Sequence, residues 1–175
     1  LKKAKKIFVR TIDHPVLQQL QEEGIQFESF DVVYEKHDTF EPVYEEIVAR
    51  LLESSKHESI CYAVPGHPLV AERTVQLLIE EEKKGNVKLS IQGGQSFLDP
   101  IFSALKIDPI EGFQLVDGTD FSIHQINMRS HLLIAQVYDA FSASEVKLTL
   151  MEKYRSDYPV TIVTAAGSED EVLKT

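Results

Sequence analysis

Two short glycine-containing segments carry the residue types best suited to bind a ligand. The first, VPGHPLV (Val64 to Val70), sets two prolines and Gly66 around His67. Proline restricts the backbone and removes an N–H donor, while glycine allows a close backbone approach. His67 is the one side chain of this corner able to form a hydrogen bond with a polar ligand. Taken alone, these residues fit a structural turn with an exposed histidine equally well.

The second segment, IQGGQSFLDP (residues 91–100), follows an apolar run and precedes a helical pattern. Gly93 and Gly94 can expose backbone N–H groups, and Ser96 offers a hydroxyl near a helix start, where polar or anionic groups bind readily. The simpler interpretation makes Ser96 or Asp99 only a helix N-cap.

A third interpretation treats GQSFL as a serine nucleophile elbow. Acids and histidines that could complete a triad follow downstream, namely Asp117, Asp120, His124 and His131. However, Leu98 replaces the second glycine of the G-x-S-x-G pattern, which weakens this hypothesis.

Alternating apolar runs and helical patterns must position these segments. Apolar runs predict strands at 5–11, 26–30, 59–64, 87–91, 113–116, 131–138 and 159–165, and helical patterns predict helices at 15–24, 42–54, 70–84 and 97–104. A Ser142/Glu145 capping box predicts the start of a helix that reaches residue 154. Strand–helix alternation indicates an α/β fold with a mostly parallel sheet in residues 1–108 and a mixed sheet in 109–175.

Composition narrows the classes of function. The chain has 28 acidic and 18 basic residues and a formal charge of -10, which argues against nucleic acid as a partner, because phosphate binding needs lysine and arginine. We expect no membrane span, because no apolar run approaches ~20 residues. The single cysteine, Cys61, indicates a cytoplasmic protein. The scattered histidines predict no metal site.

In this order and context, the segments resemble the tetrapyrrole (corrin/porphyrin) methylase family, whose members use S-adenosylmethionine. VPGHPLVAERT is similar to the family's G-D-P segment, IQGGQSFLDPIFSAL to the element that follows, and residues 132–172 to the C-terminal lobe. DPIEGFQLVDG and AQVYDAFSASEVKLTLMEKY are most similar to the branch fused to a MazG-type nucleotide pyrophosphohydrolase. The resemblance covers essentially the whole chain.

The resemblance implies a two-lobed fold, a homodimer, and methyl transfer from S-adenosylmethionine to a small-molecule acceptor that the sequence does not identify. It assigns no catalytic residue. The cofactor-binding positions it implies are Gly66, His67, Val70, Ser96, Phe97, Gln136 or Val137, and Ala165 or Ala166.

Two departures separate this sequence from the family pattern. His67 stands where the family has the aspartate of G-D-P, and the family's opening strand with its G-x-G-x-G-D loop does not precede LKKAKKIFVR, which is similar to the end of the first helix. We therefore expect the methylase fold without its first strand. The alternative function is a non-catalytic ligand-binding or dimerisation module attached to the pyrophosphohydrolase.

Overall fold

The computed structural model describes residues 4–175, which form two compact units that meet in the sequence at Ser96 and Phe97. The division falls before the boundary predicted at residue 108, because helix α5 (Leu98–Leu105) packs within the second unit: the rings of Phe102 and Phe113 lie 5.0 Å apart, edge to face. The predicted helix end at residues 1–3 lies outside the described residues. No helix among residues 4–175 is long and apolar enough to cross a membrane.

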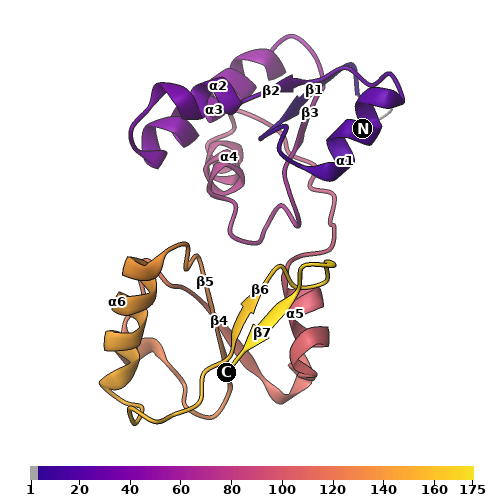
Figure 1. Ribbon diagram of the computed structural model, residues 1–175. Helices are drawn as coiled ribbons and strands as arrows, with labels where there is room; N and C mark the ends of the chain where they lie inside the picture. Colours follow the sequence, from indigo (N-terminus) through magenta and orange to yellow (C-terminus); the bar gives the residue numbers. More distant parts are fainter. Residues whose placement is uncertain (1–3) are drawn as a thin grey trace. The chain divides into compact units, whose positions relative to one another are not determined.

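The first unit is built on a parallel three-stranded sheet in the order β2-β1-β3 (Figure 1). The strands are β1 (Lys6–Val9), β2 (Glu28–Ser29) and β3 (Ile60–Ala63). The helices between and after them are α1 (Pro15–Glu22), α2 (Asp31–Lys36), α3 (Phe40–Ser55) and α4 (Arg73–Lys83). This confirms the predicted α/β class with a mostly parallel N-terminal sheet.

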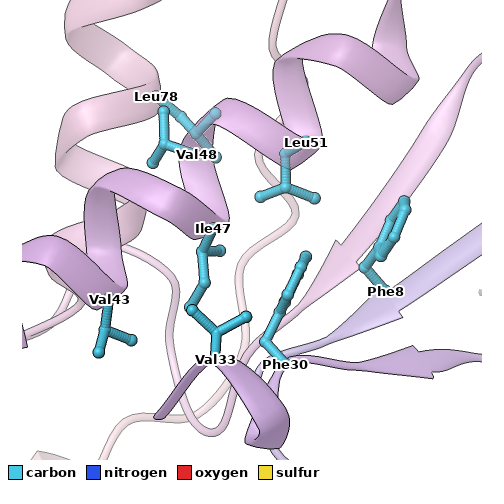
Figure 2. Close-up of a cluster of buried hydrophobic side chains, with 8 residues drawn as sticks. All are labelled: Phe8, Phe30, Val33, Val43, Ile47, Val48, Leu51 and Leu78. Carbon is cyan, nitrogen blue, oxygen red and sulfur yellow. The ribbon is translucent and has the colours of Figure 1, made fainter. Parts of the chain in front are cut away.

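Alternate residues of β1 enter two different apolar clusters, as expected for a strand that is covered on both faces. Phe8 joins the larger cluster with residues of α2, α3 and α4, whose members include Phe30, Val33, Ile47 and Leu78 (Figure 2). Ile7 and Val9 instead pack with Leu17 of α1 on the other face. The connection from β1 therefore runs along one face of the sheet, and the helices before and after β3 cover the opposite face.

The second unit contains two separate two-stranded sheets. Strands β4 (Phe113–Asp117) and β5 (His131–Ala135) are parallel, and β6 (Ile162–Thr164) and β7 (Val172–Lys174) are antiparallel. Both strand directions occur, as a mixed-sheet lobe implies, but in different sheets. Helix α6 (Ala140–Met151) follows β5, and short 3-10 turns lie at Pro109–Glu111 and Ile123–Gln125.

Three local predictions are wrong. Residues 87–91 pair with no described strand; the N–H of Leu89 donates instead to a carboxylate oxygen of Glu82 at 2.6 Å. The cap of α6 is Asp139, whose carboxylate accepts from the N–H of Ser142 at 2.7 Å, so Ser142 and Glu145 lie inside the helix. The helix predicted from residue 70 begins only at Arg73, and Ala71, which precedes α4, is exposed.

Candidate functional site

The strand order marks one sheet edge as a candidate place for a ligand. β1 and β3 are neighbours, and their outgoing connections, through α1 and α4, run along opposite faces. In open α/β sheets, ligands bind beyond the carboxyl ends of strands at such a switch point. Arg10 follows β1 there, and its N–H donates to the carbonyl oxygen of Ala63 at 3.0 Å. The corner that contains His67 follows β3 at the same edge.

The structure brings the two glycine-containing segments of the first unit into contact. A Cβ built on Gly94 would lie 3.5 Å from the carbonyl oxygen of Gly66, and one built on Gly66 would lie 3.9 Å from that of Gln95. A Cβ on Gly93 would lie 3.4 Å from Nε2 of His67. The predicted residues Gly66 and His67 therefore share one surface with the turn that leads to Ser96.

The corner after β3 is held in shape by its own hydrogen bonds. Nδ1 of His67 accepts from the N–H of Leu69 at 3.1 Å, and the N–H of Val70 donates to the carbonyl oxygen of His67 at 2.9 Å. A neutral imidazole that accepts at Nδ1 carries its proton on Nε2, so His67 presents a donor toward Gly93. The N–H of Val70 is therefore used inside the corner.

Two left-handed residues lie within or at the end of this corner. Gly66 has φ +73° and Ala71 has φ +54°. Glycine adopts this region freely, but an alanine there costs about 1–2 kcal/mol. Strained residues persist where the surrounding structure over-determines them, and they gather at functional sites. The conformation of Ala71 therefore calls for contacts that hold it.

In the second unit, the predicted residues Gln136 and Val137 follow β5 beside the end of β4. Gln136 has φ +63°, and Val137 is exposed. The N–H of the buried Gly118 donates to the carbonyl oxygen of Ala135 at 2.8 Å, and a Cβ on Gly118 would lie 2.9 Å from Cγ2 of Val137. Gly118 thus fixes how closely β4 approaches the turn that carries Gln136.

The predicted turn at Ala165 packs against the start of α5. Ala165 has φ +51°, and its carbonyl oxygen accepts from the N–H of Ser168 at 3.1 Å. A Cβ on Gly167 would lie 2.7 Å from Cβ of Pro100. Phe97, another predicted residue, is exposed just before this helix. These positions belong to the same unit, and Ser96, the residue before them, ends the first unit.

Sequence reasoning missed a polar network at the carboxyl edge of the first sheet. The Arg10 guanidinium donates from Nη1 to Oε2 of Glu72 at 2.8 Å and from Nε to the hydroxyl of Tyr34 at 2.9 Å. The Thr74 hydroxyl donates to Oε1 of Glu72 at 2.6 Å and lies 3.1 Å from the hydroxyl of Tyr62. An arginine directly after an apolar strand was the available signal, but its partner is 62 residues away in the sequence.

Burial and charge both act on this network. Burial alone would lower the pKa of Arg10, but the attraction of Glu72 and the hydrogen bond with Tyr34 outweigh it, so the pKa of Arg10 is raised. Burial likewise raises the pKa of the Tyr62 phenol. Arg10 therefore stays charged and Tyr62 stays neutral throughout the pH range in which proteins are folded.

The structure gives the nucleophile-elbow hypothesis little support. An elbow needs a strand directly before the serine turn, and residues 87–91 form no described strand. Among the described residues of the second unit, His131 contacts Glu111 at 3.4 Å, and Asp117 accepts from Thr119 in its own turn. Nor does any group of three or more metal-ligating side chains gather within residues 4–175.

Comparisons with known proteins identify a family and a fold. Residues 1–175 match the family model of the Tetrapyrrole (Corrin/Porphyrin) Methylases. The chain is 56% identical over 175 residues to the uncharacterized protein YabN of Bacillus subtilis (strain 168), and it spans 36% of that protein's length. It also resembles the crystal structure of diphthine synthase, with a TM-score of 0.62 and 20% identity over 99% of this chain and 71% of that one. This likeness confirms the predicted fold.

Proposed function

Because this chain belongs to the tetrapyrrole (corrin/porphyrin) methylase family, we propose that it binds S-adenosylmethionine and transfers the methyl group of that cofactor. The observation that carries the proposal is the meeting of the two glycine-containing segments at the switch point of the parallel sheet. Because Gly66, Gly93 and Gly94 have no side chains, their backbone groups are open to a ligand at this surface. That arrangement suits a ligand that is recognised mainly through backbone groups.

The chain's residues supply polar and backbone groups suited to this cofactor. In the proposal, backbone groups around Gly66 and Val70 hold its methionine part, and Nε2–H of His67 offers a donor for a carboxylate or hydroxyl oxygen. Ser96, Phe97, Gln136, Val137 and Ala165 complete the proposed binding positions. When bound, S-adenosylmethionine supplies an electrophilic methyl group on a sulfonium.

Methyl transfer of this kind needs no obligatory acid or base from the protein. The main requirement is to orient the acceptor for an in-line approach to the methyl group and to exclude water. We propose a small-molecule acceptor and name no catalytic residue, since fold alone does not fix the substrate.

We propose further that this domain belongs to a longer cytoplasmic, homodimeric protein with a MazG-type pyrophosphohydrolase. The chain spans 36% of the Bacillus subtilis relative, so most of that protein lies outside the matched domain. The fusion is supported by the resemblance of residues 108–118 and 135–154 to the MazG-linked branch. The cytoplasmic location is supported by the single cysteine.

Calorimetry on the full-length protein that carries this chain tests the proposal. We expect S-adenosylmethionine and S-adenosylhomocysteine both to bind, and Gly94→Val to weaken binding at least tenfold because its branched side chain would press on the Gly66 carbonyl. Ser90→Val is the matched control: it adds a branched side chain to the same exposed segment, away from the corner. An absence of binding by the unaltered protein at millimolar ligand would reject the proposal.

A second candidate function is a module that binds the cofactor without catalysis and regulates an attached pyrophosphohydrolase. It is favoured by His67, a histidine where the family has an aspartate. If the cofactor binds but no acceptor is methylated, and the pyrophosphohydrolase rate responds to S-adenosylmethionine, this second function replaces the first.

A further inference from the structure

We propose that Arg10 and Glu72 are positioning residues that hold the corner at residues 64–72 in its ligand-binding shape. The inference rests on the proposed function for its ligand, but the geometry that carries it lies entirely within the first unit. Both residues act through the backbone that connects β3 to α4.

Glu72 is an unusual residue for a helix start. It is the N-cap of α4, yet its side chain makes no cap hydrogen bond with the helix backbone. Only 3% of it is exposed, and its two carboxylate oxygens receive Arg10 and Thr74. A buried carboxylate with two dedicated donors is fixed in position, since losing either donor leaves one of its buried oxygens without that hydrogen bond.

The partners of Glu72 come from the elements that frame the corner. Arg10 directly follows β1, and its other donor, Nε, is bound by Tyr34 of α2. Thr74 lies in the first turn of α4 and contacts the hydroxyl of Tyr62 in β3. The network therefore ties the strand before the corner to the helix after it.

Ala71, the residue before Glu72, shows which backbone conformation the network of Arg10, Glu72 and Thr74 holds in place. Ala71 keeps a left-handed conformation, at φ +54°, although it is exposed and its own methyl group has no packing role to enforce it. Anchoring Glu72 determines where the corner must end, and Ala71 takes the conformation that reaches that point. Releasing the anchor should let Ala71 relax and open the bonds between His67, Leu69 and Val70.

Net stability is a poor explanation for this ion pair. Burying two charges costs about as much as their attraction returns, and a well-packed apolar pair often stabilises a protein equally well. The geometry favours a specific role, because one carboxylate fixes the directions of three elements at the ligand edge.

The test compares Glu72→Gln with Glu41→Gln in the full-length protein. Glu41 forms an ion pair with Arg73, the residue after Glu72. The N–O distance is also 2.8 Å, but both side chains are about half exposed. Glutamine keeps the size of the side chain and can still accept from Thr74, so the fold should persist. The first readout is amide hydrogen exchange at Leu69 and Val70, relative to the β1–β3 ladder.

We expect Glu72→Gln to speed exchange at Leu69 and Val70 about tenfold or more while the ladder is unaffected, and Glu41→Gln to change neither. S-adenosylhomocysteine should bind at least tenfold more weakly to the Glu72→Gln protein only. Unchanged exchange at the corner, or an equal acceleration of every amide in the unit, overturns the inference. If Glu72→Gln fails to fold, Arg10→Lys, which keeps the charge but loses the Tyr34 bond, should give the same pattern in weaker form.

Failure of the proposed function has a different signature. If the unaltered protein binds no S-adenosylhomocysteine, the cofactor assignment is wrong, but the exchange measurement still decides whether Arg10 and Glu72 hold the corner. If the unaltered protein binds and Glu72→Gln binds equally well, the cofactor assignment stands and the positioning role is rejected.

Discussion

Replacing Gly118 by alanine tests how closely β4 and the turn after β5 must approach each other. A Cβ at this position would lie 2.8 Å from the carbonyl oxygen of Ala135 and 2.9 Å from Cγ2 of Val137. Cβ atoms in folded proteins essentially never come this close to other heavy atoms. The carbonyl cannot move aside freely, because it accepts the N–H of Gly118 itself at 2.8 Å.

The expected cost has two parts. Forcing a methyl group into a packed site costs about 1–3 kcal/mol, and weakening the hydrogen bond between Gly118 and Ala135 adds about 1 kcal/mol. Gly118→Ala should therefore lower the free energy of unfolding of the second unit by about 2–4 kcal/mol. The backbone dihedrals contribute little, because Gly118 does not have a positive φ.

Urea unfolding, together with amide exchange in β4 and β5, measures the effect. Gly94→Ala is the matched control: its φ is not positive either, and its new Cβ would meet its nearest neighbour at an ordinary 3.5 Å. We expect the control to stay within about 0.5 kcal/mol of the unaltered protein. If Gly118→Ala is equally mild and the β4–β5 amides keep their protection, the close approach described here is wrong.

Three further predictions concern backbone and charge. Lys106 ends α5 with φ +55°, so Lys106→Gly should raise the free energy of unfolding by about 0.5–1 kcal/mol in urea titrations. Asp139→Ala should destabilise the first turn of α6, seen as faster exchange there, whereas Glu145→Ala should not, because Asp139 is the cap. Burial would raise the pKa of Asp31, but hydrogen bonds from Thr11 and Ile12 outweigh it and lower that pKa. The stability lost in Asp31→Asn should thus be largest above about pH 4 and vanish as the pH falls through the lowered pKa, which unfolding midpoints across pH would show.

The sequence predicted the elements whose patterns are strong and local. The helical spacing of Val43, Ile47 and Leu51 predicted α3, and the apolar runs around Phe8 and Cys61 predicted β1 and β3. All three patterns reflect burial in one unit, which the structure confirms. The contact between the two glycine-containing segments could be anticipated only in outline, from the rule that ligands bind at carboxyl edges.

The failures come from interactions that the local sequence patterns did not capture. VKLSI has the composition of a strand, but a strand also needs a neighbour, and here the N–H of Leu89 donates to the carboxylate of Glu82 instead. The Ser142/Glu145 pattern satisfies the capping rule, yet the helix begins earlier, and Asp139 caps it by accepting from the N–H of Ser142. No local pattern could pair Arg10 with Glu72, because that contact depends on β1 and β3 being neighbours in the sheet.

Ser96 and Phe97 occupy a special place among the proposed binding positions. They are consecutive in the sequence, yet one ends the first unit and the other begins the second. Their Cα atoms stay about 3.8 Å apart in every arrangement of the two units, because a trans peptide bond joins them. The spacing of this pair is therefore set by covalent geometry rather than by packing. A single residue inserted between Ser96 and Phe97 would separate these two proposed binding positions and leave the apolar clusters of the first sheet intact.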